Sequence, residues 1–135
     1  MNIMHFLTPK AQVEYIFYES TVRQGLEKMR HYGFSAIPVI DKDGRYYGTV
    51  TEGDFLWALY SDKAPGLKQL ENKPLTSIMR RSWAAVNAGA DMAEILNRAT
   101  QQNFVPVVDD REMFIGIITR KAIMQHLATI QTDVL

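Results

Sequence analysis

The sequence contains no cysteine, which excludes a disulfide scaffold, a thiolate metal site and a cysteine nucleophile. No apolar run approaches the roughly 20 residues that a membrane-spanning helix needs, and the N-terminal stretch lacks the layout of a signal peptide. Fifteen basic residues balance fifteen acidic ones, so no overall charge attracts nucleic acid or an anionic membrane. We therefore expect a cytoplasmic protein that contacts neither nucleic acid nor a membrane.

The residue sets that usually carry catalysis are also missing. The three histidines, His5, His31 and His126, are scattered and have no metal-ligand spacing around them. No Ser/His/Asp set, carboxylate pair or glycine-rich phosphate loop can be assembled. We expect neither a metal nor a catalytic cofactor, and the chain is not expected to be an enzyme. A small nucleotide hydrolase would need a metal site that the sequence does not offer.

What the sequence does contain is an internal repeat. The segment Pro38–Leu59 aligns without a gap to Pro106–Leu127, and Pro, Val, Asp, Gly, Thr and Leu coincide. A polar stretch, Tyr60–Pro74, separates the two copies. The 135 residues therefore divide into a first repeat at 1–60, a linker at 61–74 and a second repeat at 75–135, which together form one compact module.

Each repeat follows the order β-α-β-β-α. Thr21 with Gln24 forms a capping box at the start of a helix, and Gly33 is suited to end that helix in the left-handed conformation. In the first repeat we expect strands at Val13–Tyr18, Ala36–Ile40 and Tyr46–Val50, and a second helix at Phe55–Tyr60 capped by Thr51. In the second repeat we expect a strand near Trp83–Val86, a helix at Asp91–Gln101, a hairpin across Asp109–Glu112 and a helix at Lys121–Ile130.

One such repeat has too few strands to bury both faces of its sheet. We therefore expect an α/β fold (α+β in some schemes) in which two units pack sheet to sheet with pseudo-two-fold symmetry. That pairing creates two equivalent clefts, each bordered by the N-terminus of a second helix. Free N–H groups and the positive end of the helix dipole favour an anion there.

The two second helices begin differently. The first repeat has Thr51-Glu-Gly-Asp54, whereas the second has Thr119-Arg-Lys-Ala122. A threonine N-cap followed by an acid at the third position is explained by helix capping alone, at about 1 kcal/mol for the cap. The copy without the acid shows, however, that the helix does not require it. Asp54 is therefore either a cap or an acceptor for a ligand's hydroxyl groups, whose charge-assisted hydrogen bonds are worth about 1.5–3 kcal/mol each.

The repeated signature is an apolar-Pro-Val-apolar-Asp strand, a hairpin, and Gly-apolar-apolar-Thr followed three positions later by Asp or Asn. Together these motifs resemble the cystathionine-β-synthase (CBS) domain family, specifically the tandem pair called a Bateman module, from about Phe6 to Leu127. The resemblance implies a stand-alone, non-catalytic module that binds AMP, ADP or ATP and signals its ligand state to an unidentified regulated protein by changing conformation. It also implies a homodimer.

The resemblance assigns ligand contacts to matching positions. Asp54 would bind the ribose hydroxyls and Thr51 the ribose-phosphate region. Ala36, Ile37 and Pro38 would receive adenine, and Thr8 to Lys10 would close the same cleft. In the second repeat Val105 and Pro106 match the adenine run and Thr119 keeps its role, but Phe104 replaces Ala36 and Ala122 replaces the ribose-binding acid. Arg80 and Arg120 make this second cleft more basic and suited to phosphate.

Other functions remain open at this point. The clefts could be empty in a module that serves only dimerisation or interaction, or they could receive cyclic di-AMP or S-adenosylmethionine. The aromatic residues of the first repeat are expected in the core or at a dimer interface. They are Tyr15, Phe17, Tyr18, Tyr32, Phe34, Tyr46, Tyr47 and Trp57.

Overall fold

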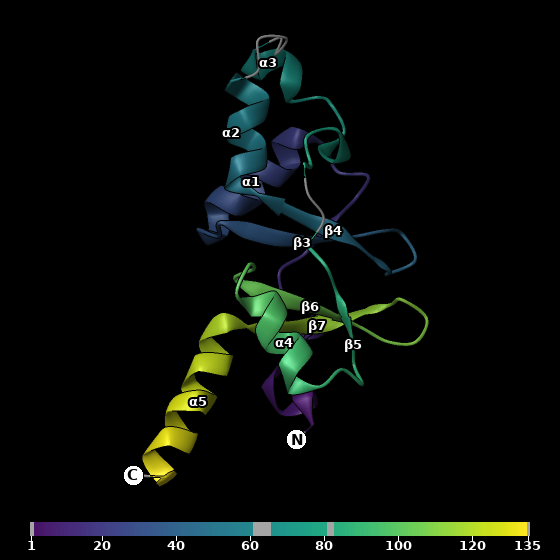
Figure 1. The fold of residues 1–135 in the computed structure, drawn as a ribbon. Coiled ribbons are helices and arrows are strands. Elements are labelled where there is room, and N and C mark those ends of the chain that lie inside the picture. The colour runs from purple at the N-terminus through teal and green to yellow at the C-terminus, as the bar shows by residue number, and fades with distance from the viewer. Residues whose placement is uncertain (1, 61–65, 81–82, 135) are drawn as a thin grey trace. The chain divides into compact units, whose positions relative to one another are not determined.

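The β-α-β-β-α order occurs twice in the folded chain, as expected (Figure 1). The computed structural model describes residues 2–60, 66–80 and 83–134, with the backbone alone for residues 67 and 130–134. The first copy comprises β2 (Ile16–Phe17), α1 (Val22–Tyr32), β3 (Ala36–Ile40), β4 (Tyr46–Thr51) and α2 (Glu52–Tyr60). The second comprises β5 (Val86–Asn87), α4 (Met92–Ala99), β6 (Phe104–Val108), β7 (Phe114–Thr119) and α5 (Arg120–Val134). Outside the repeats lie η1 (Ile3–Phe6), β1 (Leu7–Pro9), η2 (Lys10–Gln12), α3 (Leu67–Leu70) and η3 (Leu75–Ser77).

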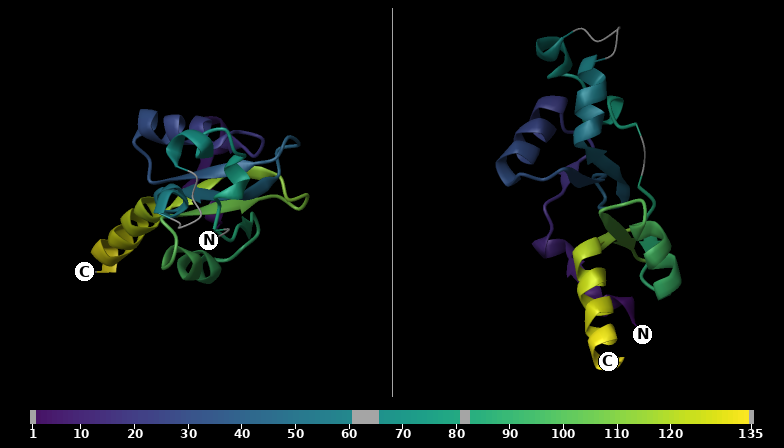
Figure 2. Two further views of the ribbon diagram at one scale, coloured as in Figure 1. Left: turned by 90° about the horizontal axis from the view of Figure 1, so that it is seen from above. Right: turned by 60° about the vertical axis from the view of Figure 1, so that its left-hand side comes forward.

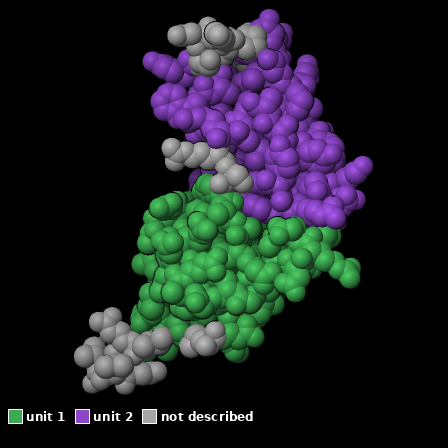
Figure 3. Space-filling model, turned by 45° about the vertical axis from the view of Figure 1, so that its right-hand side comes forward, with its two compact units in different colours: residues 1–13, 83–135 green, residues 14–82 purple. Residues whose placement is uncertain are grey.

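The chain forms two compact units whose boundaries differ from those of the sequence repeats. Unit 2 comprises residues 14–82, and unit 1 comprises residues 1–13 together with 83–135 (Figure 3). The N-terminal part of the first repeat, residues 1–13, therefore belongs to the same unit as most of the second repeat. The stretch expected as a linker, residues 61–74, and the start of the second repeat, residues 75–82, belong to unit 2 together with most of the first repeat.

Backbone hydrogen bonds and core packing account for this exchange. In unit 1, β1 pairs antiparallel with β7, and Thr8 lies opposite Ile117. In unit 2, Leu70, Leu75 and Ile78 are buried in the core. The Leu75 N–H donates to the Ser20 carbonyl oxygen at 2.8 Å. The described part of the expected linker is thus an integral part of unit 2.

Unit 2 contains a three-stranded sheet in the order β2-β3-β4. Strand β2 runs parallel to β3, and β3 and β4 form an antiparallel hairpin. The predicted capping box of α1 is confirmed, because Thr21 and Gln24 exchange side-chain to backbone hydrogen bonds. Gly33 ends the helix with φ 69°, as expected for a left-handed cap. Residues Val22, Met29, Ile37, Val39, Val50 and Phe55 form the core around this sheet.

Unit 1 contains a four-stranded sheet in the order β1-β7-β6-β5. The β6–β7 hairpin carries a register shift between Val107 and Val108, and the β3–β4 hairpin has the equivalent shift between Val39 and Ile40. The two hairpins are therefore alike in their irregularities as well as in their strands. The core is formed by Ile3, Val86, Ile95, Val105, Val107 and Ile118.

Several expected boundaries are wrong. The strand predicted at Val13–Tyr18 is only Ile16–Phe17, the two residues that pair with β3. The strand near Trp83–Val86 begins at Val86. Helix α4 stops at Ala99, and α2 begins three residues before the expected Phe55. Helix α5 continues to Val134, as seen along its length in Figure 2.

Candidate ligand site

The N-terminus of α2 is closed by a reciprocal pair of hydrogen bonds. The Asp54 N–H donates to Thr51 Oγ1 at 3.3 Å, and the Thr51 N–H donates to Asp54 Oδ2 at 2.8 Å. This is a capping box in which aspartate takes the place of the usual glutamate. The capping interpretation of Asp54 is therefore confirmed, and it leaves the second carboxylate oxygen, Oδ1, outside the box.

That second oxygen accepts the backbone N–H of Arg80 at 3.1 Å. Sequence reasoning placed Arg80 in the second repeat's cleft, and the structure shows that Arg80 belongs to unit 2, where it bonds to Asp54. The Arg80 guanidinium lies over the Trp57 ring, with Cζ 5.4 Å from the ring centroid. Asp54 is only 4% exposed, whereas Trp57 is 50% exposed. The carboxylate is thus enclosed, and the Arg80–Trp57 pair lies outside it.

The expected adenine-facing residues lie on the strand next to this helix start. In the β3–β4 register Ala36 pairs with Thr51, Ile37 with Val50 and Pro38 with Thr49. Ile37 and Pro38 are buried, so Ala36 is the partly exposed member of the three. We call the group Ala36, Ile37, Pro38, Thr51, Asp54 and Arg80 the Asp54 site. The structure brings all six together within unit 2.

The same unit contains one strongly shifted titrating group. Burial raises the pKa of the Tyr46 phenol well above its ordinary value, and the hydrogen bond with Thr49 offsets a smaller part of this rise. Tyr46 Oη and Thr49 Oγ1 are 2.7 Å apart. Thr49 is fully buried, so its hydroxyl and the neutral phenol satisfy one another. Tyr46 therefore acts in the structure as a neutral hydrogen-bonding group.

The corresponding helix start in unit 1 keeps the hydroxyl and lacks the acid. The Ala122 N–H donates to Thr119 Oγ1 at 3.1 Å. Phe104 pairs with Thr119, as Ala36 does with Thr51, but it is buried. Its ring lies 4.8 Å from that of Trp83. A bulky ring therefore occupies the position that alanine holds in unit 2.

The Arg120 guanidinium, which the sequence suggested would be directed to a phosphate, donates to backbone carbonyl oxygens. Its Nε donates to the Ala99 carbonyl oxygen and its Nη2 to the Gln102 carbonyl oxygen, both at 2.9 Å. Both carbonyls lie at or just beyond the C-terminus of α4, where a cation is favourable to the helix dipole. The expectation of a phosphate-directed Arg120 is corrected, because the guanidinium closes the end of a helix.

Thr8 and Lys10 belong to unit 1 and Asp54 belongs to unit 2, so their expected place beside Asp54 stays a prediction. Across the sheet Thr8, Ile117 and Pro106 form one row, and Leu7, Ile118 and Val105 form the next. Thr8 therefore lies on the same sheet as the second adenine-facing run. We call the group Thr8, Lys10, Val105, Pro106, Thr119 and Arg120 the Thr119 site. Sequence reasoning missed the short β1 segment, whose pairing partner lies far away in the sequence.

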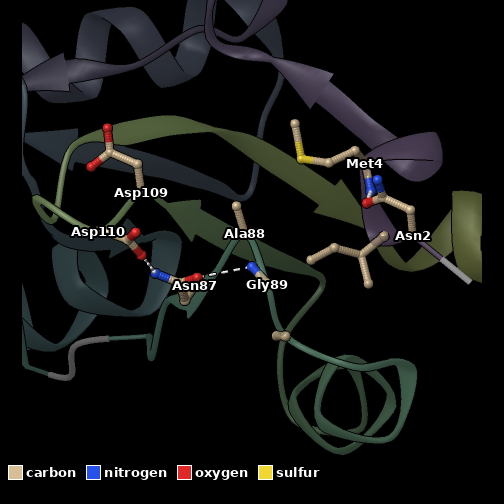
Figure 4. Close-up of a pocket in the computed structure, with 9 residues that line it drawn as sticks. Asn2, Met4, Asn87, Ala88, Gly89, Asp109 and Asp110 are labelled. Atoms are coloured by element: carbon tan, nitrogen blue, oxygen red, sulfur yellow. Dashed lines mark hydrogen bonds between the residues drawn. The ribbon is translucent and has the colours of Figure 1, made fainter.

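A separate cavity of about 570 Å³ lies in unit 1, lined by residues of the N-terminal segment and of two loops (Figure 4). Asn87 Nδ2 donates to Asp110 Oδ1 at 2.9 Å, and Asn87 Oδ1 accepts the Gly89 N–H at 2.8 Å. Asp109 Oδ1 accepts the backbone N–H groups of Arg111 and Met113. These polar groups hold loops together. Among the described residues no group of three His, Cys, Asp or Glu could hold a metal ion.

The chain is similar to known proteins over most of its length. The family model described as "CBS domain" matches residues 6–61 and 75–129. An uncharacterized protein of Methanocaldococcus jannaschii is 27% identical over 104 residues, which is 71% of this chain and 37% of that protein. A CBS domain-containing protein of Dictyostelium discoideum is 26% identical over 116 residues, covering 81% of this chain and 80% of that protein. The chain thus spans little more than a third of the archaeal relative.

Solved structures with the same fold cover nearly the whole chain. CbpB in complex with c-di-AMP is 24% identical with a TM-score of 0.86, covering 99% of this chain and 89% of that one. CbpB of Listeria monocytogenes with c-di-AMP is 18% identical with a TM-score of 0.86, covering 98% of each chain. CBSX2 in complex with AMP is 23% identical with a TM-score of 0.78, covering 96% and 98%. Within the described residues, no helix is long and apolar enough to cross a bilayer.

Proposed function

The chain belongs to the CBS domain family, and on that premise we propose that it is a non-catalytic regulatory protein that binds an adenosine nucleotide at the Asp54 site. One observation carries the proposal. A buried carboxylate stands at the start of α2, directly beside the strand that holds Ala36. Its counterpart helix in unit 1 begins with the same hydroxyl cap and no acid. A carboxylate that the fold can do without is suited to bind a ligand.

The chemistry of the carboxylate suits a ribose. An ionised carboxylate has about four acceptor positions on its two oxygens, and the fold uses one backbone N–H on each oxygen. The vicinal 2′ and 3′ hydroxyls of a ribose would use the remaining acceptor positions, together with the position on Oδ1 that the Arg80 N–H occupies in the free protein. Adenine would lie along the backbone of Ala36, and Arg80 is the proposed phosphate contact. Charge-assisted hydrogen bonds of this kind give both affinity and a requirement for the diol.

The Thr119 site is proposed to bind nucleotide more weakly or not at all. Ala122 offers no acceptor for a diol, and buried Phe104 occupies the position of Ala36. The Arg120 guanidinium is already bonded to two carbonyl oxygens. Thr8, Lys10, Val105, Pro106 and Thr119 stay candidate contacts for a ligand of another shape.

Isothermal titration with adenosine, AMP, ADP and ATP tests the proposal. We expect one strong binding event per chain, lost in Asp54→Asn, which keeps the size of the side chain and removes its charge. GMP and 2′,3′-dideoxyadenosine serve as matched ligands that alter the base or remove the diol. Ala122→Asn is the control at the corresponding position of unit 1 and should bind like the wild type. Equal affinity of wild type and Asp54→Asn for every adenosine compound would contradict the assignment.

A receptor for c-di-AMP is the second candidate, because two structures with the same fold contain that ligand. The dinucleotide has two adenosine halves, and it lacks a free 3′ hydroxyl because each ribose is linked through it. The two candidates therefore differ in their dependence on Asp54. If c-di-AMP binds more tightly than AMP, and Asp54→Asn weakens AMP far more than c-di-AMP, the dinucleotide is the ligand. S-adenosylmethionine belongs in the same titration series.

We also propose that the protein is a homodimer. Equivalent positions of the two second helices carry exposed apolar side chains, namely Leu56 with Met124 and Leu59 with Leu127. Beside α2 a groove of about 290 Å³ is lined by Leu26, Met29, Phe34 and Phe55 among others. Repeated apolar positions suit an isologous interface. Light scattering should give twice the chain mass, and Leu59→Glu with Leu127→Glu should reduce it to one chain. A monomeric wild type would refute the dimer.

The proposed regulatory step is a shift of population. A nucleotide favours the conformation that it binds more tightly, and a partner protein responds to that conformation. The alternative of a ligand-independent interaction module makes a different prediction. In that case Asp54→Asn would leave association with any partner unchanged, and the protein would melt at one temperature with and without nucleotide.

A further inference from the structure

Asp54 is poorly accessible for a residue at the first turn of a helix. Glu52 and Leu56 on the same helix are exposed, yet Asp54 is only 4% exposed. A vicinal diol must bring two hydroxyl groups against the carboxylate, and such access is incompatible with this burial. Something that covers Asp54 must therefore move before a ribose can bind there.

The backbone at Arg80 contacts the carboxylate directly. Its N–H lies 3.1 Å from Oδ1. The chain just before it is firmly held, because Leu75 is fully buried and Ile78 is 6% exposed. Arg80 itself is exposed, and its guanidinium lies over the half-exposed Trp57 ring. Of the described residues after Ile78, Met79 packs against the core, whereas Arg80 is joined to unit 2 by the backbone hydrogen bond to Asp54 and by the exposed ring contact.

The other bond to Asp54 has a different character. The Thr51 N–H and Oδ2 belong to the capping box of α2, which is local to the helix and is closed at both ends. A ligand can leave that box intact. The Arg80 contact joins residues that are 26 positions apart, and no second backbone bond of the capping box depends on it. Of the two N–H donors, Arg80 is the one that can be displaced.

Arg80 lies close to the boundary between the two units in the chain. Residues 14–82 form unit 2 and residue 83 begins the larger part of unit 1 (Figure 3). Arg80 thus stands where the chain passes from one unit to the other. The hydrogen bond between the Arg80 N–H and Asp54 therefore joins the proposed ligand site to the end of unit 2, where the chain continues into unit 1.

We propose that the Arg80 backbone amide is an autoinhibitory latch, which occupies Asp54 in the free protein and is displaced when a ribose diol binds. The inference rests on the proposed nucleotide function of the Asp54 site. The diol hydroxyls replace the Arg80 N–H at Oδ1, while the Thr51 N–H stays on Oδ2. Displacement releases Arg80 and frees its guanidinium from Trp57. The apparent affinity is reduced by the fraction of molecules in which the latch is open.

Arg80→Pro tests the latch, because proline has no N–H to donate. Arg80→Ala is the matched control, since it removes the same guanidinium and keeps the amide. Adenosine is the probe, because it has the diol and lacks the phosphate that Arg80 would contact. We expect Arg80→Pro to bind adenosine about tenfold more tightly than Arg80→Ala, as for a latch that is open in about one molecule in ten. Equal or weaker binding by Arg80→Pro would overturn the latch.

A second measurement needs no variant. Hydrogen exchange at the Arg80 amide, followed by NMR in the wild type, should accelerate when AMP binds, although most amides near a ligand become protected. Slower or unchanged exchange at saturating AMP, with binding still dependent on Asp54, would disprove the latch and leave the nucleotide function in place. Absence of binding by AMP and adenosine in every protein tested would remove both proposals.

Discussion

The two helix starts, at Thr51 in unit 2 and Thr119 in unit 1, have the same hydroxyl cap and different chemistry behind it. Each threonine oxygen accepts the N–H three residues later. Only unit 2 adds a carboxylate, and that carboxylate binds two backbone N–H groups and is buried. The comparison shows that capping the helix needs only the hydroxyl. The acid at Asp54 therefore carries a further role, which we assign to the ligand and the latch.

The largest effect is expected in the sheet of unit 1, which differs from the sheet of unit 2 by the additional edge strand β1. A Cβ added to Gly116, whose φ is 155°, would lie 2.2 Å from the Thr8 carbonyl oxygen. Gly116→Ala should therefore push β1 off β7 and lower the free energy of unfolding by about 3 kcal/mol. Urea denaturation measures this. Gly53→Ala is the control, since its Cβ would meet Thr51 Oγ1 at 3.6 Å and Trp57 Cδ1 at 3.9 Å, which are ordinary contact distances. If both variants were equally stable, β1 would not depend on this close approach.

Asp54→Ala makes the helix start of unit 2 resemble that of unit 1. It removes the acceptor of the Thr51 and Arg80 N–H groups. We expect a loss of about 2 kcal/mol in the free energy of unfolding, because two donors lose a charged partner. Asp54→Asn keeps one carbonyl acceptor and should lose less. A stability equal to that of the wild type in Asp54→Ala would mean that water replaces both bonds.

Tyr46 and Phe114 occupy equivalent positions, and only the first titrates. Because burial raises the pKa of Tyr46, the folded state favours the neutral phenol. Its contribution to stability is complete below the unfolded pKa of about 10 and is lost as the pH rises above it, by about 1.4 kcal/mol at pH 11. Tyr46→Phe should lack this alkaline loss. The difference between unfolding curves of the two proteins at pH 8 and 11 measures it, and parallel losses would contradict the assignment.

Ala122→Asp is the converse change and has the smallest expected effect. It places an acid at the third position of α5, as Asp54 is placed in α2. The helix dipole should stabilise the variant by about 0.3–1 kcal/mol at low salt. The melting temperature should rise slightly and the gain should shrink as salt is added. Ala122→Asn controls for side-chain size. A destabilised Ala122→Asp would show that the partly buried position does not accept a charge.

Local features of the fold were predictable from the sequence. The Thr21–Gln24 capping box and the Gly33 stop are confirmed, because both depend on residues within one or two helical turns. The hairpins follow from the repeat, down to strands of matching length. Strand Val13–Tyr18 was overestimated, since aromatic alternation says nothing about where a pairing partner ends.

The candidate site was predictable only in part. Ala36, Thr51 and Asp54 were expected together and lie on paired strands and the helix that follows them. The bond of Arg80 to Asp54 was not expected, because it joins distant residues and leaves no periodic pattern. Arg120 was expected to be available to phosphate, but the end of α4 binds its guanidinium. Charge in a sequence does not disclose which carbonyl oxygens lie nearby.

By itself the sequence determined two β-α-β-β-α repeats, their caps and turns, and the difference between Asp54 and Ala122. These features follow from short-range backbone preferences and from residue identity at matched positions. The tertiary structure alone decided that Leu7–Pro9 pair with a strand of the second repeat and that Leu70, Leu75 and Ile78 complete the core of the first. It also decided that the Arg80 backbone N–H donates to Asp54. The physical reason is that long-range pairing satisfies hydrogen bonds and buries apolar surface wherever partners meet in space, regardless of their order in the chain.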